Sequence, residues 1–128
     1  MKRLLLVSAL VSIAGASAAQ TTKVTSLLSR DLTGIAGKEG ALMTVEYAPG
    51  AADPVHRHGA YVFVYVLEGA VTMQVKGAAP VTLHPGETFY EAPDDIHLVG
   101  RNASSTEPAK FLALFVKDKG GPVVMPAQ

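Results

Sequence analysis

The distribution of apolar residues after residue 20 constrains the fold more than any other feature of the sequence. These residues come in short runs that glycine and proline interrupt at intervals. Such punctuation is typical of an all-β sandwich or barrel, because glycine and proline supply the backbone angles of tight turns. After residue 20, no window keeps the i, i+3, i+4 apolar spacing of an amphipathic helix over three turns. The sequence therefore predicts an all-β domain.

Eight segments are expected to form strands. They are Val24–Leu28, Ala41–Tyr47, Ala60–Leu67, Ala70–Lys76, Pro80–Leu83, Glu87–Ala92, Ile96–Gly100 and Ala109–Lys117. The last of these segments is apolar at nearly every position, so both of its faces are expected to be covered. The residues that follow it are expected to form either a loose tail or a short edge strand.

The first residues have the features of a secretory signal peptide. Lys2 and Arg3 precede an apolar stretch, and a small-x-small cleavage pattern ends at Ala18. A membrane-spanning helix would need roughly 20 apolar residues, whereas this stretch is shorter and interrupted by serines. The expected organisation is a signal peptide over residues 1–18, an N-terminal segment with the first strand over 19–40, a barrel over 41–118 and a tail over 119–128.

The composition narrows the class of protein and its partners. With 128 residues, 48% of them hydrophobic, the chain can build one core and is too short for two ordinary domains. The formal net charge is zero, so no broad electrostatic field attracts nucleic acid or an anionic membrane. Cysteine is absent, which excludes disulfides, thiolate ligands, a cysteine nucleophile and a lipid anchor on cysteine. We expect a soluble periplasmic or secreted protein with no nucleic-acid partner and, after signal cleavage, no membrane partner.

Two of the four histidines, His56 and His58, stand one residue apart just before a run of valines and aromatic residues. Side chains alternate between the two faces of an extended segment, so both imidazoles are expected on the same face. Continuing the alternation places four small or branched side chains on that inward face, namely Ala60, Val62, Val64 and Val66. The aromatic side chains of Tyr61, Phe63 and Tyr65 are then expected to point outward, either packed against a second sheet or forming a dimer surface.

A third candidate ligand, His97, lies in another predicted strand, turn and strand unit. Three neutral imidazoles that meet at one point form a site for one divalent transition metal, with positions left open for water, oxygen or substrate. Iron, manganese, nickel, copper and zinc all suit such ligands, so the sequence does not select among them. The fourth histidine, His84, precedes a Pro-Gly turn and is expected to be an exposed loop residue.

At these residues the chain resembles the cupins. Four residues look like the first cupin motif, G(x)5HxH…G, namely Gly50, His56, His58 and Gly69. Four others look like the second motif, namely Gly86, Pro93, His97 and Asn102. The resemblance covers about residues 42–116 and implies a small, single-domain antiparallel jelly-roll β-barrel, of a kind that often dimerises. It also implies one metal inside the barrel, with the three histidines in the ligand positions.

The chain departs from the cupin pattern at one ligand. The first motif usually carries a glutamate or glutamine four or five residues after its second histidine, where this chain has Val62 and Phe63. The second motif's internal glycine is replaced by Asp95. A substitute carboxylate could come from Glu91, which stands inside an apolar strand and needs either a partner or solvent. Glu91 is therefore a candidate fourth ligand, general base or partner of a ligand, with a solvent-facing strand residue as the alternative.

These features lead to two function hypotheses. The first is an exported, metal-dependent cupin enzyme, a dioxygenase-like oxidoreductase or an isomerase, acting on a small organic substrate. The second is a cupin that binds a metal or a small ligand without catalysis, which the missing carboxylate of the first motif favours. A sensory module of a transcription regulator is disfavoured, because the chain has neither a basic patch nor an added nucleic-acid-binding segment.

Overall fold

Eight strands make up the regular structure of residues 21–128, the part of the chain that this computed structural model describes. They are β1 (Thr22–Asp31), β2 (Lys38–Tyr47), β3 (Tyr61–Glu68), β4 (Val71–Val75), β5 (Val81–Leu83), β6 (Thr88–Glu91), β7 (His97–Asn102) and β8 (Ala109–Asp118). Each strand overlaps one of the eight predicted segments. The predicted signal peptide lies outside the described residues. Within those residues, no helix has the length and apolarity needed to cross a membrane.

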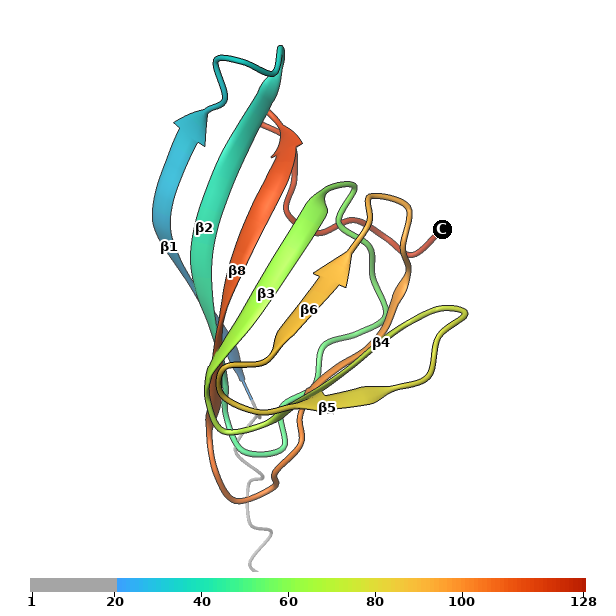
Figure 1. Ribbon diagram of the computed structural model, residues 1–128. Coiled ribbons are helices and arrows are strands. Elements are labelled where there is room, and N and C mark those ends of the chain that lie inside the picture. The colour runs from blue at the N-terminus through green and yellow to red at the C-terminus, as the bar shows by residue number, and fades with distance from the viewer. Residues whose placement is uncertain (1–20) are drawn as a thin grey trace, which may run out of the picture.

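The strands form two antiparallel sheets that face each other (Figure 1). One sheet has the order β1-β2-β8-β3-β6 and the other has the order β5-β4-β7. Strands that are distant in sequence pair in both sheets, as β2 does with β8 and β4 with β7. This arrangement confirms the predicted all-β, antiparallel jelly-roll fold. Because β1 pairs along β2 in the larger sheet, residues 22–40 belong to the same folded unit as the strands that follow.

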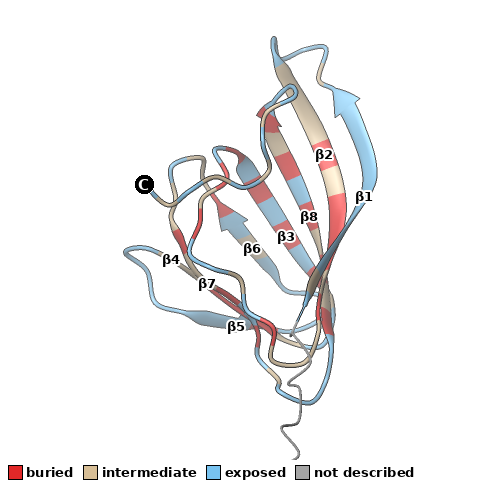
Figure 2. Ribbon diagram, turned by 180° about the vertical axis from the view of Figure 1, so that it is seen from behind, coloured by how far each residue is buried: buried red, intermediate tan, exposed pale blue. Residues whose placement is uncertain are grey.

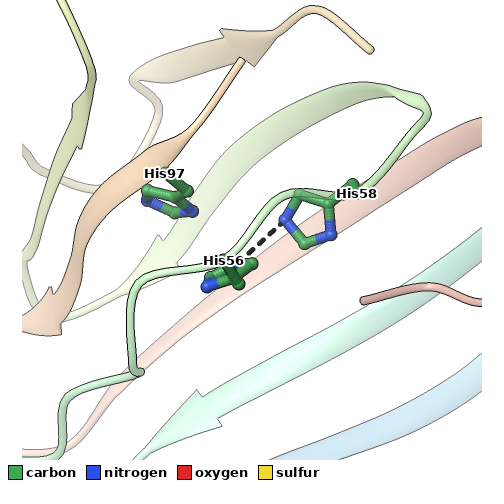
Figure 3. A group of neighbouring side chains, drawn as sticks. All are labelled: His56, His58 and His97. Atoms are coloured by element: carbon green, nitrogen blue, oxygen red, sulfur yellow. Dashed lines mark hydrogen bonds between the residues drawn. The ribbon is translucent and has the colours of Figure 1, made fainter. Parts of the chain in front are cut away.

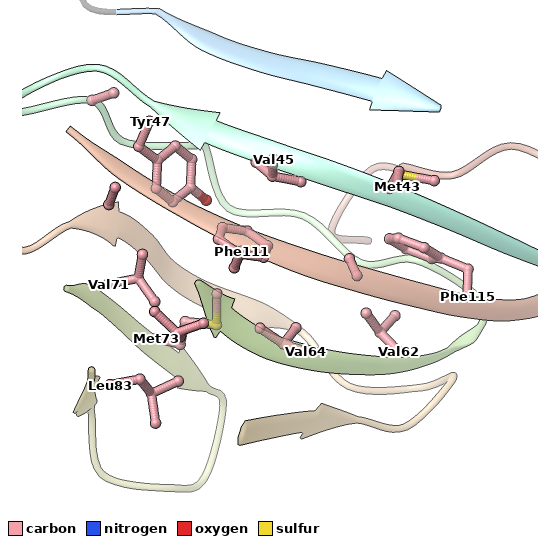
Figure 4. Packing of buried hydrophobic residues seen from close by; sticks show 14 of the residues in the cluster. Met43, Val45, Tyr47, Val62, Val64, Val71, Met73, Leu83, Phe111 and Phe115 are labelled. Atoms are coloured by element: carbon pink, nitrogen blue, oxygen red, sulfur yellow. The ribbon is translucent and has the colours of Figure 1, made fainter. Parts of the chain in front are cut away.

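The inner faces of the sheets bury the hydrophobic core (Figure 4). On β3, Val62, Val64 and Val66 are each at most 4% exposed, whereas the intervening Tyr61 and Phe63 are 45% and 50% exposed. Along β8, buried residues likewise alternate with intermediate or exposed ones (Figure 2). The alternation predicted from the histidine segment is therefore confirmed, with valines inside and aromatic side chains outside.

The outer face of the five-stranded sheet carries an apolar row that crosses every strand. Its members are successive cross-strand partners: Leu28, Leu42, Leu114, Phe63 and Tyr90. Leu28, Phe63 and Tyr90 are each about half exposed, and Leu114 is 38% exposed. The expectation that both faces of the β8 segment are covered is therefore wrong for the single chain, in which only the inner face is buried.

Two residues of the cupin motifs have structural roles at the ends of strands. Gly69 has a φ of 69° and follows β3, and a side chain there would collide with the backbone of Pro108. Asn102 is buried at the end of β7, where its amide donates hydrogen bonds to the carbonyls of Tyr47, Ala48 and Glu107. The glycine permits the close approach of two loops, and the asparagine ties three segments together.

Candidate metal centre

The backbone brings His97 next to the His56 segment by a direct antiparallel bridge (Figure 3). The His97 amide donates to the His56 carbonyl at 2.7 Å, and the His56 amide donates to the His97 carbonyl at 3.2 Å. Because His58 lies two residues further along an extended segment, its side chain points to the same side as that of His56. The bridge therefore brings the two halves of the predicted ligand set together.

The three imidazoles converge on one buried point. One potential ligand nitrogen from each of His56, His58 and His97 lies within 4.8 Å of the other two. The three side chains are 4–9% exposed, so bulk water does not solvate them. The centroids of the His56 and His97 rings are 4.9 Å apart, and those of the His56 and His58 rings are 4.6 Å apart.

Backbone carbonyls fix the tautomers of the first two histidines. Nδ1 of His56 lies 2.7 Å from the carbonyl oxygen of Pro54, and Nδ1 of His58 lies 2.6 Å from that of Val123. Since a carbonyl oxygen can only accept, both Nδ1 atoms carry the proton and donate. In the neutral form of each ring, the lone pair is therefore on Nε2, which is the tautomer that binds a metal through Nε2.

These two Nε2 atoms lie 3.1 Å apart. Figure 3 marks this contact as a hydrogen bond, which requires a proton on one of the two atoms. When each neutral ring carries its proton on Nδ1, both Nε2 lone pairs are directed into the same space, and a shared cation or proton would relieve the contact. Two nitrogens at about 2.1 Å from one metal, with an angle of roughly 95° between them, have this separation. The geometry of His56 and His58 thus fits two neighbouring ligands of one ion.

Burial keeps two of the histidines neutral. Desolvation, with smaller contributions from the neighbouring His56 and His58, lowers the pKa of His97 to about 4. Desolvation also lowers the pKa of His58. Metal ligation requires the neutral imidazole, so both rings are in the binding form at neutral pH.

Glu91 lies in the same site. It is 2% exposed, which makes the solvent-facing alternative wrong. Its Oε2 is 3.7 Å from Nε2 of His58, and its Oε1 is 3.3 Å from Nδ1 of His97. Desolvation, with a smaller contribution from the charge of Asp95, raises the pKa of Glu91 to about 7.

Three polar atoms of the site have no hydrogen-bond partner among residues 21–128. They are Oε1 of Glu91 and both ring nitrogens of His97. Although Oε1 and Nδ1 are 3.3 Å apart, they lack the alignment of a hydrogen bond. An unpaired buried polar atom costs about 1–3 kcal/mol. A cation bound by Oε1 of Glu91 and one ring nitrogen of His97 would offset part of that cost, so the residues present fit a divalent metal with three nitrogen ligands and one oxygen ligand.

A cavity of about 220 Å³ opens onto the three histidines and Glu91. Apolar side chains from the inner faces of the strands form most of its wall, among them Val62, Val64, Met73, Phe111, Ala113 and Phe115. Asp53, Tyr47 and Thr22 form a polar corner. There Asp53 accepts a hydrogen bond from the Tyr47 hydroxyl at 2.5 Å and another from the Thr22 hydroxyl at 3.0 Å.

The C-terminal segment crosses the site. Arg57 and Met125 exchange two backbone hydrogen bonds, of 3.1 and 2.8 Å. The Arg57 side chain also donates to the Pro126 carbonyl at 2.9 Å. This pairing holds Val123 against His58 and makes Val123 and Val124 part of the cavity wall. The segment is therefore held to the His56–His58 segment by one isolated bridge, and it forms no strand of either sheet.

Sequence reasoning missed several of these contributions. The carbonyls of Pro54 and Val123 have no residue-type signature, because every residue carries one. Asp53 and its partner Thr22 belong to segments that a single sequence does not place side by side. The exclusion of His84 agrees with the structure, since its side chain is 63% exposed and pairs with Glu87.

The fold and the site together define a small jelly-roll protein with a buried, histidine-rich centre. A sequence model of the cupin domain matches residues 43–115, which is more than half of the chain. The chain belongs to the cupin family. The three-histidine group predicted from its motifs could hold a metal ion.

Several solved structures share this fold. The cupin domain of an XRE family transcriptional regulator from Enterobacter cloacae has 29% identity over 73% of this chain and 94% of that chain, with a TM-score of 0.57. A recombinant oxalate oxidase in complex with glycolate has 22% identity over 86% of this chain and 57% of that chain, with a TM-score of 0.64. The DMSP lyase DddQ from Ruegeria pomeroyi DSS-3 has 22% identity over 68% of this chain, with a TM-score of 0.59.

This chain covers only part of the length of some of these proteins. This chain covers 42% of the Ruegeria lyase and 44% of a second lyase structure, less than half of each. At 22% identity or below, the two lyases and the oxidase show a shared fold and no shared activity. No curated protein matches the sequence.

Proposed function

We propose that this protein is a metal-dependent oxidoreductase of the dioxygenase type, acting on a small organic substrate. The observation that carries the proposal is the convergence of three buried histidines and one buried carboxylate at the end of a cavity. Imidazole and carboxylate ligands with open positions suit the redox-active divalent metals iron, manganese, nickel and copper, as well as zinc.

The residues of this chain have distinct roles in the proposal. His56, His58 and His97 would hold the ion, with Glu91 as the fourth ligand. When bound, the metal would polarise a substrate oxygen as a Lewis acid and, if redox-active, make O2 chemistry accessible. The Glu91 carboxylate lines the cavity, and the oxygen that does not bind the metal would be placed to accept a proton from a substrate hydroxyl.

Metal analysis of two histidine variants tests the proposal. We expect about one transition-metal ion per purified wild-type chain, the same content in His84→Ala, and none in His97→Ala. His84 is the matched control because it is exposed and lies outside the three-histidine group. Oxygen uptake with a panel of small phenols, enols and keto acids then tests for catalysis. A chain that binds no metal, even after reconstitution, would contradict the proposal.

A second candidate function is metal or small-ligand binding without turnover. It is favoured by the polar corner, where both oxygens of Asp53 are already engaged by Tyr47 and Thr22. Glu91 and the histidines are then the remaining acid–base groups among the described residues of the cavity wall. Stoichiometric metal with no oxygen uptake and no substrate conversion would support this candidate over the enzyme.

We propose, further, that the protein is exported to the periplasm or secreted. The support is the signal-peptide pattern of residues 1–18. N-terminal sequencing of the protein from fractionated cells tests it, and we expect the mature chain to begin near Gln20. A chain that keeps its first residues and stays in the cytoplasm would contradict export.

We also propose that two copies associate through the outer face of the five-stranded sheet. The support is the apolar row that runs from Leu28 on β1 to Tyr90 on β6. Isolated apolar side chains are ordinary on a protein surface, but a continuous apolar patch commonly marks an interface. A self-complementary sheet face of this kind suits a two-fold symmetric dimer.

A further inference from the structure

We propose that the ligand of this site is a small molecule with an apolar, ring-sized body and a single oxygen-donor end, as in a substituted phenol or enol. This inference rests on the proposed function, because the donor end is assigned to the metal position. It goes further by assigning the class of the rest of the molecule. Four properties of the cavity carry it: its wall, its charge, its hydrogen-bonding capacity and its mouth.

The wall sets the size and the character of the body. Strand side chains such as Val64, Met73 and Phe111 surround the space with hydrocarbon and thioether surface. An apolar cavity of about 150 Å³ holds benzene. A cavity of about 220 Å³ therefore holds a ring with one short substituent, about ten non-hydrogen atoms. A body of this size gains free energy by leaving water for such a wall.

The charge of the cavity excludes polyanions. Among the described residues that line it, none is a lysine or an arginine, and two, Asp53 and Glu91, are carboxylic acids. A phosphate ester or a dicarboxylate would bring a second negative charge into a site whose only added cation is the metal. Burying a charge without a partner is costly. Sugar phosphates and short diacids are therefore poor ligands for this cavity.

The hydrogen-bonding capacity of the wall excludes polyols. Tyr47 and Thr22 use their hydroxyl protons on Asp53, and His56 and His58 use their Nδ1 protons on backbone carbonyls. A sugar would lose its bonds to water and find few replacements outside the metal position. Each unpaired buried hydroxyl costs about 1–3 kcal/mol. A ligand with one polar end, bound by the metal and Glu91, leaves none of its own polar groups unpaired in the cavity.

The mouth of the cavity is apolar as well. Val24 on β1 and Val124 on the C-terminal segment both line the cavity, yet they are 59% and 57% exposed. Exposed aliphatic side chains at the rim of a cavity are typical of a binding site for an apolar molecule. The apolar surface thus continues from solvent to the histidines, which favours entry of the body as well as its binding.

A pair of hydroxamates tests this class because the metal-binding head is constant. Benzohydroxamate and acetohydroxamate carry the same chelating group, and they differ in having a phenyl ring or a methyl group. With metal-loaded protein in a titration calorimeter, we expect benzohydroxamate to bind about tenfold or more tightly, with a more negative heat-capacity change. Hydroxyacetohydroxamate, which has a polar body, should bind no more tightly than acetohydroxamate. Equal affinities for the phenyl and methyl compounds would overturn the inference.

Two variants test whether the tighter binding of benzohydroxamate depends on the cavity. Val64→Phe fills part of the cavity, and we expect it to remove the advantage of the phenyl compound while the metal content stays at about one per chain. If that variant fails to fold, we would use Val124→Ser at the exposed mouth in its place. We expect this variant to reduce the advantage of the phenyl compound by a smaller amount. An unchanged phenyl advantage in the folded variant would overturn the inference.

The outcomes separate the two proposals. If the protein binds metal and shows no preference between the two hydroxamates, the class of ligand is wrong and the proposed metal function stands. If the protein binds no metal, the proposed function fails. Toluene binding to the metal-free chain, followed by NMR chemical shifts of the cavity valines, then tests the apolar cavity on its own. Shifts confined to those valines would support it, and their absence would contradict it.

Discussion

Glu91 on β6 is the cross-strand partner of Val62 on β3. Val62 occupies one of the positions where the first cupin motif usually has its carboxylate, and side chains directly opposite each other in a pair of strands share one face. The carboxylate of Glu91 therefore projects into the same interior space as a glutamate at position 62 would. This chain can supply its acidic group from the neighbouring strand.

Moving the carboxylate back across the strand pair tests this relationship. We expect Glu91→Val to weaken metal binding by about 10–100-fold, because it removes the one oxygen ligand. The double variant Glu91→Val, Val62→Glu should recover most of the affinity, since the same group returns from the opposite residue. Competition with a chromophoric chelator measures both. A double variant no better than the single one would show that Glu91 acts through its strand and not through its carboxylate.

Shortening the C-terminal segment should weaken the metal site without touching a ligand. The Val123 carbonyl holds the proton of His58 on Nδ1. A chain that ends at Lys119 loses this acceptor, and we expect metal affinity to fall about 10–100-fold. A chain that ends at Met125 keeps Val123 and the backbone pairing with Arg57, so it is the matched control. The chelator assay serves again, and equal affinities for the two truncated chains would refute a role for Val123.

The stability of the metal-free protein should depend on pH because of Glu91. Its pKa is raised from about 4.5 in the unfolded chain to about 7 in the fold. Between these values the folded state binds the extra proton, so the free energy of unfolding falls as pH rises from 4.5 to 7. The loss is about 3 kcal/mol at most. The Glu91→Gln variant has no carboxyl group at this position to ionise, so its stability should not fall for this reason.

Urea denaturation in the presence of a chelator measures the difference between Glu91→Gln and wild type. We expect the variant to gain stability relative to wild type as the pH is raised from 5 to 8. The effect of His97, whose lowered pKa works in the opposite direction, is present in both proteins and largely cancels in the comparison. A difference that stays constant with pH would show that Glu91 is ionised in the fold at both values.

The outer apolar row should control the oligomeric state. Phe63 is 50% exposed at the centre of the row, and we expect Phe63→Lys to convert a dimer into a monomer. Ile35→Lys is the control, because Ile35 is 53% exposed in the turn between β1 and β2, outside the row. Light scattering after gel filtration gives the mass of each. A wild-type monomer at micromolar concentration would contradict the dimer.

The strands and their orientation could be predicted because they depend on local pattern. Glycine and proline mark the turns, and the period-two alternation from His56 to Val66 assigns each side chain to a face. The limits of β1 were less accurate. Its apolar part ends at Leu28, but pairing with β2 continues to Asp31, because backbone hydrogen bonds do not require apolar side chains.

The site was only partly accessible from the sequence. The three histidines follow from motif spacing, whereas the contribution of Glu91 depends on the register between β3 and β6, which a single sequence does not reveal. The same holds for Asp53 and Thr22, which are 31 positions apart in the sequence and meet through tertiary packing. For β8, an apolar sequence on both faces does not distinguish burial within the chain from an exposed face that a partner could cover.

The groups that form the centre extend from the Pro54 carbonyl to the Val123 carbonyl, and the bridge between His56 and His97 closes it. A nascent chain leaving the ribosome therefore has no formed centre until residue 123 has emerged and the two sheets have closed. Under the proposed function, the ion is acquired after synthesis of the whole domain, so the compartment in which folding finishes determines which metals compete for it.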